Sequence, residues 1–355
     1  MTTHFFLGAN SGQGFQNLFN RFCDPEDHYD LVVLKGGPGS GKSTMMRTIG
    51  KAMEEKGEQV EYLYCSGDPD SLDGVHIARI RTAIVDGTAP HIIEPKYPAA
   101  VDRYVNLGQF YDIDAAKRNR ADIVRFTQAG SAAYRRAYRA FGAARQMDDG
   151  AAALVTDGLD AAKLLRRTDG IIGRELRGKG SGSRDDYRFL GSLTCQGPVW
   201  RFDSVQTLCP KVYVLQDAYG LAAPMLQRLH GAAAARGFQA VVCPDPEHTD
   251  RIQHLLLPEL KLAFVTSRDG MTYTGPSYRR IRLDAMVDAA HYKRFKARLR
   301  FSAKVSDALR GEGLDALREA KAAHDQLEAV YHPYMNFEGV NQLVQEELAR
   351  IERRL

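Results

Sequence analysis

The residues best suited to chemistry form a short glycine-rich segment that ends in a lysine and two hydroxyl residues. The segment reads Gly36-Gly37-Pro38-Gly39-Ser40-Gly41-Lys42-Ser43-Thr44. Residues 36–43 match the pattern G-x-x-x-x-G-K-S, in which backbone N–H groups surround a phosphate because the glycines leave room for it. We expect Lys42 to contact the β- and γ-phosphates and the Ser43 hydroxyl to bind Mg²⁺. The pattern therefore predicts a site for a nucleoside triphosphate.

A magnesium-dependent site also needs carboxylates near the loop, and the sequence offers two groups of them. Asp86 follows the apolar run Ala83-Ile84-Val85 and is our first candidate for a second Mg²⁺ ligand or for positioning the attacking water. Asp68, Asp70 and Asp73 follow another predicted strand, and any of them could be a general base or a second Mg²⁺ contact. Asp68 is the best catalytic candidate among them. Each of these aspartates is also compatible with an ordinary turn or helix cap.

A regular alternation of elements must hold these residues. Apolar strands are predicted over residues 31–35, 59–65 and 83–86, and a helix over residues 43–56. Strand–helix–strand alternation favours a three-layer α/β fold with a mostly parallel sheet and helices on its faces. The glycine-rich loop would then join the first of these strands to the helix, so that the helix N-terminus faces the phosphates.

Two segments rich in helix-forming residues interrupt or follow this pattern. Residues 108–177 contain many alanines and arginines, and residues 284–355 are again helical and rich in lysine and arginine. A flexible linker is predicted over residues 178–187, which gives two domains, residues 1–177 and 188–355. The basic helices are compatible with a solvated face, or with a lid or a surface for a protein partner.

An internal repeat relates the two domains. The segment Phe189-Leu190-Gly191 repeats Phe6-Leu7-Gly8 at an offset of 183 residues. Residues 212–215 correspond to residues 31–34 at an offset of 181, and from Cys243 onward the offset is 180. So small a drift over so long a stretch predicts a tandem duplication, with two lobes of similar topology.

The repeat also reveals that the second loop differs from the first. Opposite the glycine-rich segment stands Asp217-Ala218-Tyr219-Gly220-Leu221-Ala222-Ala223-Pro224. Ala223 replaces the lysine, Pro224 replaces the serine, and Asp217 adds a negative charge where a phosphate needs positive surroundings. Asp86 has no carboxylate counterpart either, because Thr266 occupies the equivalent position. We therefore expect a degenerate second loop and one competent nucleotide site, in the first lobe.

Composition limits the cellular location and the partners that we expect for the protein. The chain has 355 residues, a formal net charge of +4 and five cysteines without metal-binding spacing. Scattered cysteines indicate reduced thiols and predict a cytoplasmic location, and we expect neither a signal peptide nor a membrane span. The charge is too small to indicate a nucleic-acid partner by itself, and the basic helices lack the interleaved aromatic residues of single-strand binders.

Taken together, these motifs resemble an uncharacterised bacterial family of two-lobed P-loop ATPase-like proteins that is common in Gram-positive anaerobes. The resemblance is carried by residues 4–10, 34–44, 65–75, 84–91, 324–328 and 335–337. It implies a P-loop NTPase fold and ATP binding, without an established substrate. In relatives the second lobe can carry its own phosphate loop, and this chain departs from them at that point.

The sequence supports three functions. The first is an ATPase that binds ATP and Mg²⁺ in the first lobe and couples hydrolysis to movement of the helical segments. The second is a small-molecule kinase with its acceptor between the lobes, although no acceptor-binding signature is visible. The third is a nucleotide sensor that changes its affinity for a protein partner.

Two details of the site stay open. The choice of ATP over GTP rests on the resemblance, and the absence of an N-K-x-D sequence agrees with it. An arginine that stabilises the transferred phosphate is common in such sites, and the sequence offers several candidates. They are Arg79, Arg81, Arg118 and Arg125.

Overall fold

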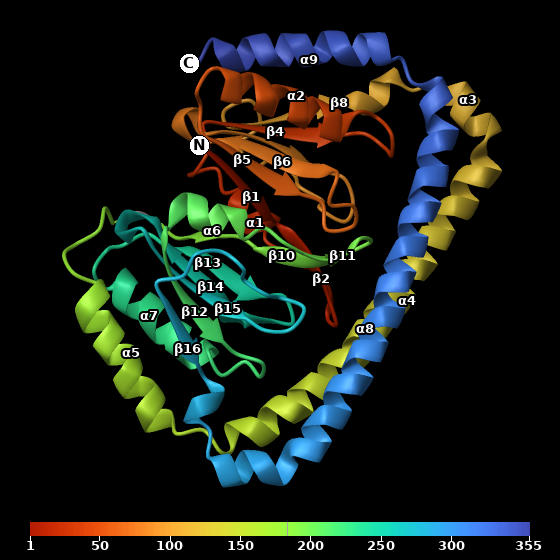
Figure 1. Cartoon of the computed structure of the whole chain (residues 1–355). Helices are drawn as coiled ribbons and strands as arrows, with labels where there is room; N and C mark the ends of the chain where they lie inside the picture. The colour runs from red at the N-terminus through yellow and green to blue at the C-terminus, as the bar shows by residue number, and fades with distance from the viewer. Residues whose placement is uncertain (183) are drawn as a thin grey trace.

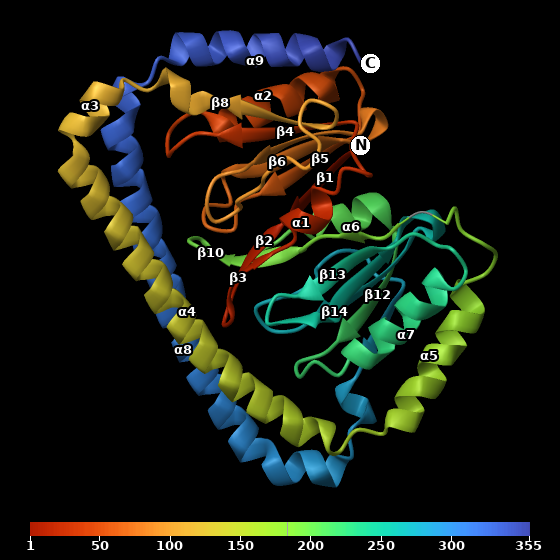
Figure 2. The same cartoon turned by 180° about the vertical axis from the view of Figure 1, so that it is seen from behind.

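The structure is a computed structural model that describes residues 1–182 and 184–355, so one residue of the predicted linker, Ser183, lies outside the described part. Two lobes lie one above the other, and a pair of long helices runs along one side of both (Figures 1 and 2). Each lobe is built on a six-stranded sheet. The two lobes predicted from the internal repeat are therefore confirmed.

The first sheet contains the strands on either side of the glycine-rich loop. In spatial order its strands are β1 (Thr2–Phe6), β5 (Val60–Tyr64), β6 (Leu72–Ile77), β7 (Thr82–Asp86), β4 (Asp30–Lys35) and β8 (Asp102–Asn106). All neighbours are parallel except at β6, which is antiparallel to both β5 and β7. The predicted strands correspond to β4, β5 and β7, and the sheet is mixed because β6 returns through a tight connection.

The second sheet repeats this order strand for strand. Its strands are β9 (Asp186–Tyr187), β13 (Val241–Asp245), β14 (His248–Leu257), β15 (Leu262–Ser267), β12 (Lys211–Gln216) and β16 (Arg279–Arg282). The register is repeated too, because Leu31 pairs with Ala83 in the first sheet and Val212 pairs with Ala263 in the second. These pairs are the positions that the sequence repeat relates.

Two hairpins and two short helices lie between the sheets. The hairpins are β2 (Gly8–Ser11) with β3 (Gly14–Asn17) and β10 (Gly191–Thr194) with β11 (Gly197–Trp200), and the helices are α1 (Phe19–Phe22) and α6 (Asp203–Leu208). The N–H of Phe6 donates to the carbonyl of Phe189 at 2.9 Å, and the N–H of Phe189 donates to Phe6 at 2.8 Å. Because each residue bonds to its own repeat counterpart, a local two-fold axis relates the lobes here.

The inner faces of the two sheets share one hydrophobic core. Val33 and Val85 of the first sheet belong to the same buried cluster as Val214 and Val265 of the second. The strand–helix alternation predicts helices on both faces of each sheet, and this prediction is wrong for the inner faces. The other lobe, together with the hairpins and the short helices α1 and α6, takes the place of a full helical layer there.

Helices cover the outer face of each sheet, and one helix in each layer comes from the other half of the chain. The first sheet carries α2 (Lys42–Glu55) and α9 (Phe337–Glu352), and the second carries α7 (Ala223–Ala234) and α5 (Ala161–Glu175). Ile351 of α9 is fully buried in the first lobe, and Ile171 of α5 is buried in the second. The predicted domain boundaries follow the chain, whereas the packing crosses them.

Two long helices make this exchange possible. The helices α4 (Arg120–Thr156) and α8 (Ala289–Tyr331) pack against each other along one side of the molecule (Figures 1 and 2). Their contact is lined by small side chains, which let two helices approach closely: Ala137, Ala144, Ala316 and Ala320. The remaining short helical elements are η1 (Ala78–Ile80), η2 (Leu107–Phe110), α3 (Ile113–Arg118), η3 (Pro258–Leu260), η4 (Asp284–Met286) and η5 (His332–Tyr334).

The helix starts extend the repeat to the C-terminus. Asp112 caps α3 and Asp288 caps α8, each by accepting a backbone N–H three residues on, at 2.9 and 2.7 Å. Asp160 and Asn336 do the same for α5 and α9. Both pairs are 176 residues apart, so the helical segments are repeated along with the sheets. Among the described residues, no helix is both long and apolar enough to cross a membrane.

Candidate functional site

The glycine-rich loop lies between the end of β4 and the start of α2. Gly39 and Gly41 have φ values of +69° and +89°, a conformation that strains any residue with a Cβ atom. At Gly36, an added Cβ would lie 2.6 Å from the Ser40 Oγ. Glycine is therefore required at these positions for a turn that leaves the backbone accessible at the N-terminus of α2.

Lys42 is the first residue of α2, and its side chain bends back over the loop. Its Nζ donates to the carbonyl oxygens of Gly36 at 2.6 Å and Gly37 at 3.1 Å. The same Nζ lies 3.6 Å from Asp86 Oδ2, and both side chains are mostly buried. The structure therefore brings together the lysine and the carboxylate that the sequence singled out. Ser43 is on the next position of the helix, where its Oγ accepts the N–H of Leu72 at 3.0 Å.

Asp86 owes its position to the strand order. Strand β7 lies beside β4, and Asp86 is paired in register with Leu34, close to the start of the loop. One carboxylate oxygen, Oδ1, accepts the N–H of Thr88 at 2.8 Å and its hydroxyl at 2.6 Å. These bonds fix the side chain and leave Oδ2 on the side of Lys42.

A second carboxylate, Asp73, lies beside Asp86 and forms a buried pair with His91. Asp73 precedes Gly74, which pairs with Val85 on the neighbouring strand. Its Oδ2 lies 3.2 Å from the Nε2 of His91, and both side chains are almost fully buried. Burial raises the pKa of Asp73; the nearby His91 opposes this shift and Asp86 adds to it.

Asp68, the best catalytic candidate of its group, is engaged in a turn. Its Oδ1 accepts the N–H of Asp70 at 3.1 Å, and its Oδ2 accepts the Ser71 hydroxyl at 3.2 Å. The same Oδ2 lies 3.4 Å from the Nζ of Lys321, a residue of α8. Asp70 faces the other lobe, because its Oδ2 accepts the amide N–H of Gln196 at 2.6 Å. Asp68 therefore lines the site, and Asp70 connects the lobes.

A cleft of about 500 Å³ opens above the loop. Its lining includes the loop, the four aspartates Asp68, Asp70, Asp73 and Asp86, and one side of α8. The α8 residues, absent from the predicted site, are Lys321, His324 and Glu328. Their spacing of three and four residues places them on one helix face, and this was the signal that the sequence contained. None of the four candidate arginines is among the described residues that line the cleft.

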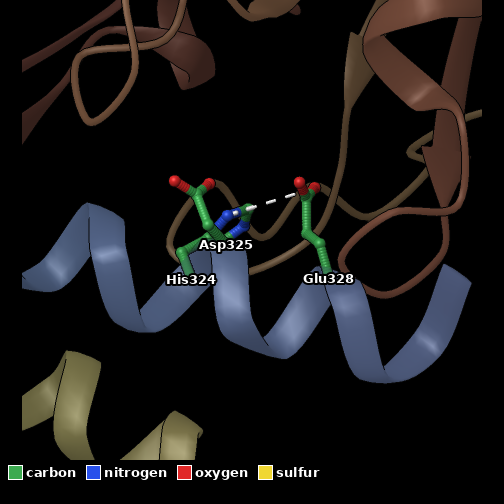
Figure 3. Close-up of side chains that lie close together, drawn as sticks. All are labelled: His324, Asp325 and Glu328. Atoms are coloured by element: carbon green, nitrogen blue, oxygen red, sulfur yellow. Dashed lines mark ion pairs between the residues drawn. The ribbon is translucent and has the colours of Figure 1, made fainter.

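The α8 face carries charges of both signs. His324, Asp325 and Glu328 have potential ligand atoms within 4.8 Å of one another (Figure 3). Glu328 also contacts the loop directly, since its Oε1 accepts the N–H of Gly39 at 3.0 Å. Lys321 pairs with both Asp68 and Asp325; burial opposes its charge, yet the two carboxylates raise its pKa.

The corresponding loop of the second lobe is filled by its own side chain. Asp217 stands at the position of Gly36 and is buried. Its Oδ1 accepts the N–H groups of Tyr219 at 3.1 Å and Leu221 at 2.9 Å, and its Oδ2 accepts that of Ala222 at 2.8 Å. A carboxylate therefore occupies the N-terminal end of α7, where a phosphate would otherwise be placed.

Comparison with known proteins gives one partial match. A family model described as Nephrocystin 3, N-terminal, matches residues 14–84, which is about a fifth of the chain and includes the glycine-rich loop. No curated protein and no solved structure matches the chain significantly. The resemblance to a two-lobed P-loop ATPase-like family finds no support in these comparisons and stays a prediction.

Proposed function

We propose that the first lobe binds ATP with Mg²⁺ and hydrolyses it, and that the second lobe has no nucleotide site. One observation carries the proposal: the Lys42 ammonium lies 3.6 Å from the Asp86 carboxylate at the mouth of a loop that requires glycine. Lysine, serine and aspartate around open backbone N–H groups form the set that phosphate and magnesium need. The cleft of about 500 Å³ is also large enough for a nucleotide.

The residues at the loop fit a magnesium ion. Oxygen ligands from a hydroxyl and one or two carboxylates are what Mg²⁺ prefers beside a phosphate chain. Ser43 and Asp86 would hold the ion. Asp73 lies beside them, and its buried Oδ2 faces the Nε2 of His91 at 3.2 Å without a hydrogen bond of good geometry. The ion would neutralise charge on the β- and γ-phosphate oxygens.

In this proposal the chain's own groups perform the remaining work. Backbone N–H groups of the loop and the positive end of α2 bind the phosphates. Lys42 leaves the carbonyl oxygens of Gly36 and Gly37 and contacts the phosphates, because a charged acceptor forms the stronger hydrogen bond. Asp86 keeps its Thr88 bonds and orients the attacking water.

Phosphate release from Mg·ATP by the purified protein tests the proposal. We expect Lys42→Ala to reduce turnover by roughly a hundredfold or more, because one preorganised charge contact with the transferred group is lost. Lys51→Ala is the matched control, since Lys51 lies exposed on the same helix. Asp86→Asn should retain metal-free nucleotide binding, turn over Mg·ATP far more slowly and need a higher Mg²⁺ concentration for half-maximal phosphate release.

The outcomes separate the three functions. Phosphate release that is unchanged in Lys42→Ala would overturn the proposed site. Tight binding of Mg·ATP without release would favour the nucleotide sensor, which the direct contact of α8 with the loop also favours. Release that requires an added pool of small metabolites would favour the kinase.

A further inference from the structure

Both loops of the molecule hold a carboxylate, and the two carboxylates come from different places. In the second lobe Asp217 belongs to the loop itself and accepts three backbone N–H groups. In the first lobe the carboxylate is that of Glu328, which belongs to α8. Among the described residues it accepts one hydrogen bond, from the N–H of Gly39 at 3.0 Å, and its Oε1 lies 4.0 Å from His324 Nδ1. The difference matters because a residue of the loop cannot leave it, whereas a residue of another helix can.

The exposure of the two side chains agrees with this distinction. The Glu328 side chain is 41% exposed, while Asp217 is only 6% exposed. A single hydrogen bond to a half-exposed carboxylate is readily exchanged, because water competes for both partners. Three hydrogen bonds to a buried carboxylate are not readily exchanged, because water does not reach them. The first loop is therefore capped by a group that can be replaced.

The end of α8 is held at the loop by a second contact as well. Tyr111 donates its hydroxyl to the carbonyl of Pro38 at 2.6 Å, and its ring packs on that of Tyr331 with centroids 5.0 Å apart. Tyr331 is the last residue of α8, less than one turn after Glu328. The C-terminal turn of the helix therefore touches the loop directly through Glu328 and indirectly through Tyr111.

We propose that Glu328 and the phosphate chain of a nucleoside triphosphate compete for the same N–H group of the loop, and that the phosphate chain displaces Glu328. The proposal rests on the function proposed above for the first lobe. A carboxylate and a phosphate repel each other at the same N–H group, so only one of them can be bound. Glu328 thereby lowers the affinity for nucleotide and makes the position of α8 depend on whether nucleotide is bound.

Displacement of Glu328 has consequences beyond the loop. Helix α8 packs along α4 and continues to the second lobe, where it begins at Ala289 (Figure 1). Lys321 and His324 lie on the same side of α8 as Glu328 and line the same cleft. When Glu328 leaves the loop, these two residues face the phosphate chain. The inference thus gives α8 a role in binding that the sequence did not assign to it.

Nucleotide affinity in Glu328 variants tests the proposal. We expect Glu328→Gln and Glu328→Ala to bind Mg·ATP about tenfold more tightly than the unmodified protein in isothermal titration calorimetry, because the competing charge is gone. Glu319→Gln is the matched control on the same helix, since Glu319 pairs with Arg136 outside the cleft. Its affinity should stay within about twofold of the unmodified protein.

Hydrogen exchange in the last turns of α8 provides a second readout. In the unmodified protein Mg·ATP should speed exchange in residues 324–331, and in Glu328→Ala that faster exchange should already be present without nucleotide. Unchanged affinity in both Glu328 variants, with ATP bound normally, would overturn this inference and leave the proposed function intact. If neither the unmodified protein nor any variant binds Mg·ATP, the proposed function itself is wrong and this inference falls with it.

Discussion

Glu247 is a partly buried carboxylate that joins the two lobes. It belongs to the second lobe, and its Oε2 and Oε1 accept the N–H of Gly12, from the first lobe, at 2.9 and 3.2 Å. Burial raises the pKa of Glu247 to about 7; the Gly12 N–H opposes the shift and Asp245 adds to it. Arg145 and Arg310 also face the group and favour its charged form. At neutral pH the contact therefore contains a carboxylate close to its titration point.

This raised pKa predicts a stability effect with a definite sign. Below the ordinary pKa of 4.5 the side chain is protonated in both the folded and the unfolded chain. As the pH rises toward 7 only the unfolded chain loses the proton, so the folded protein loses stability. Glu247→Gln mimics the protonated form. At pH 8 we expect its free energy of unfolding to be about 2–3 kcal/mol higher than that of the unmodified protein, and at pH 4.5 we expect the two values to be nearly equal.

Urea unfolding of both proteins at the two pH values measures the effect. Glu55→Gln is the control, because Glu55 is exposed at the end of α2 and the same change should leave the difference near zero. An equal free-energy difference at both pH values would contradict the assignment of a raised pKa to Glu247.

At this scale the sequence predicted the residues whose role is local and missed those that depend on distant packing. Lys42, Ser43 and Asp86 follow from a motif and from one apolar run, which are short-range patterns. Asp73 is only one of several alternatives in the sequence, because the strand that carries it contains acidic and glycine residues and therefore lacks a clear strand pattern. Glu328 could not be placed, because nothing local to residue 328 indicates that α8 ends at the loop.

Helix α9 is the element whose position is least expected from the order of the chain. Ile351 lies on α9 with no exposed surface and belongs to the same buried cluster as Met46 and Ile49 of α2. We expect Ile351→Ala to lower the free energy of unfolding by about 2–4 kcal/mol, the cost of a cavity in a packed core. Hydrogen exchange in α2 should become faster, while exchange in α7, on the other lobe, should not change.

The matched control is Leu355→Ala, because Leu355 follows α9 and is 40% exposed. Its free energy of unfolding should stay within about 0.5 kcal/mol of the unmodified protein. Faster exchange in α7 rather than α2 on Ile351→Ala would contradict the packing of α9 on the first lobe.

The elements themselves were partly predictable. Strands with continuous apolar runs, such as β4 and β7, were found because burial on both faces leaves a clear pattern. Strand β6 is not predicted from the sequence, since Asp73 and Gly74 are poor strand formers and their burial depends on the neighbouring strands. The helical character of residues 120–156 and 289–331 was evident from composition, but the partner of each helix was not.

The whole molecule is organised by the repeat and by the exchange of helices across it. The repeat was visible in the sequence because its offset drifts so little, and it predicted the two lobes. The exchange was not visible, because an amphipathic pattern shows which face of a helix is buried but not against which sheet. Two sheets of the same topology offer similar surfaces to α5 and α9. The length and geometry of α4 and α8 therefore determine on which sheet each of these helices packs.

This exchange predicts that the two halves of the chain stay together after the linker is cut. A protease site inserted in the segment 178–182 would separate residues carrying β4 and α5 from those carrying β12 and α9. Each half then covers a sheet of the other with a helix, and the inner faces of both sheets share one core. We expect the cut protein to elute from gel filtration as one species at the volume of the uncut protein.

The contribution of the exchanged helix can be separated from that of the shared core. With Val344→Ala and Ile351→Ala together in α9, the cut protein should dissociate at a lower urea concentration than the cut protein with Leu355→Ala, because only the first pair weakens a contact between halves. In the uncut chain the same pair of substitutions should lower the urea concentration at which α9 detaches by a smaller amount, since the linker keeps α9 at a high local concentration near its sheet. Cut halves that elute apart without urea, each still compact, would show that every lobe is completed by its own half and that the exchange of helices is wrong.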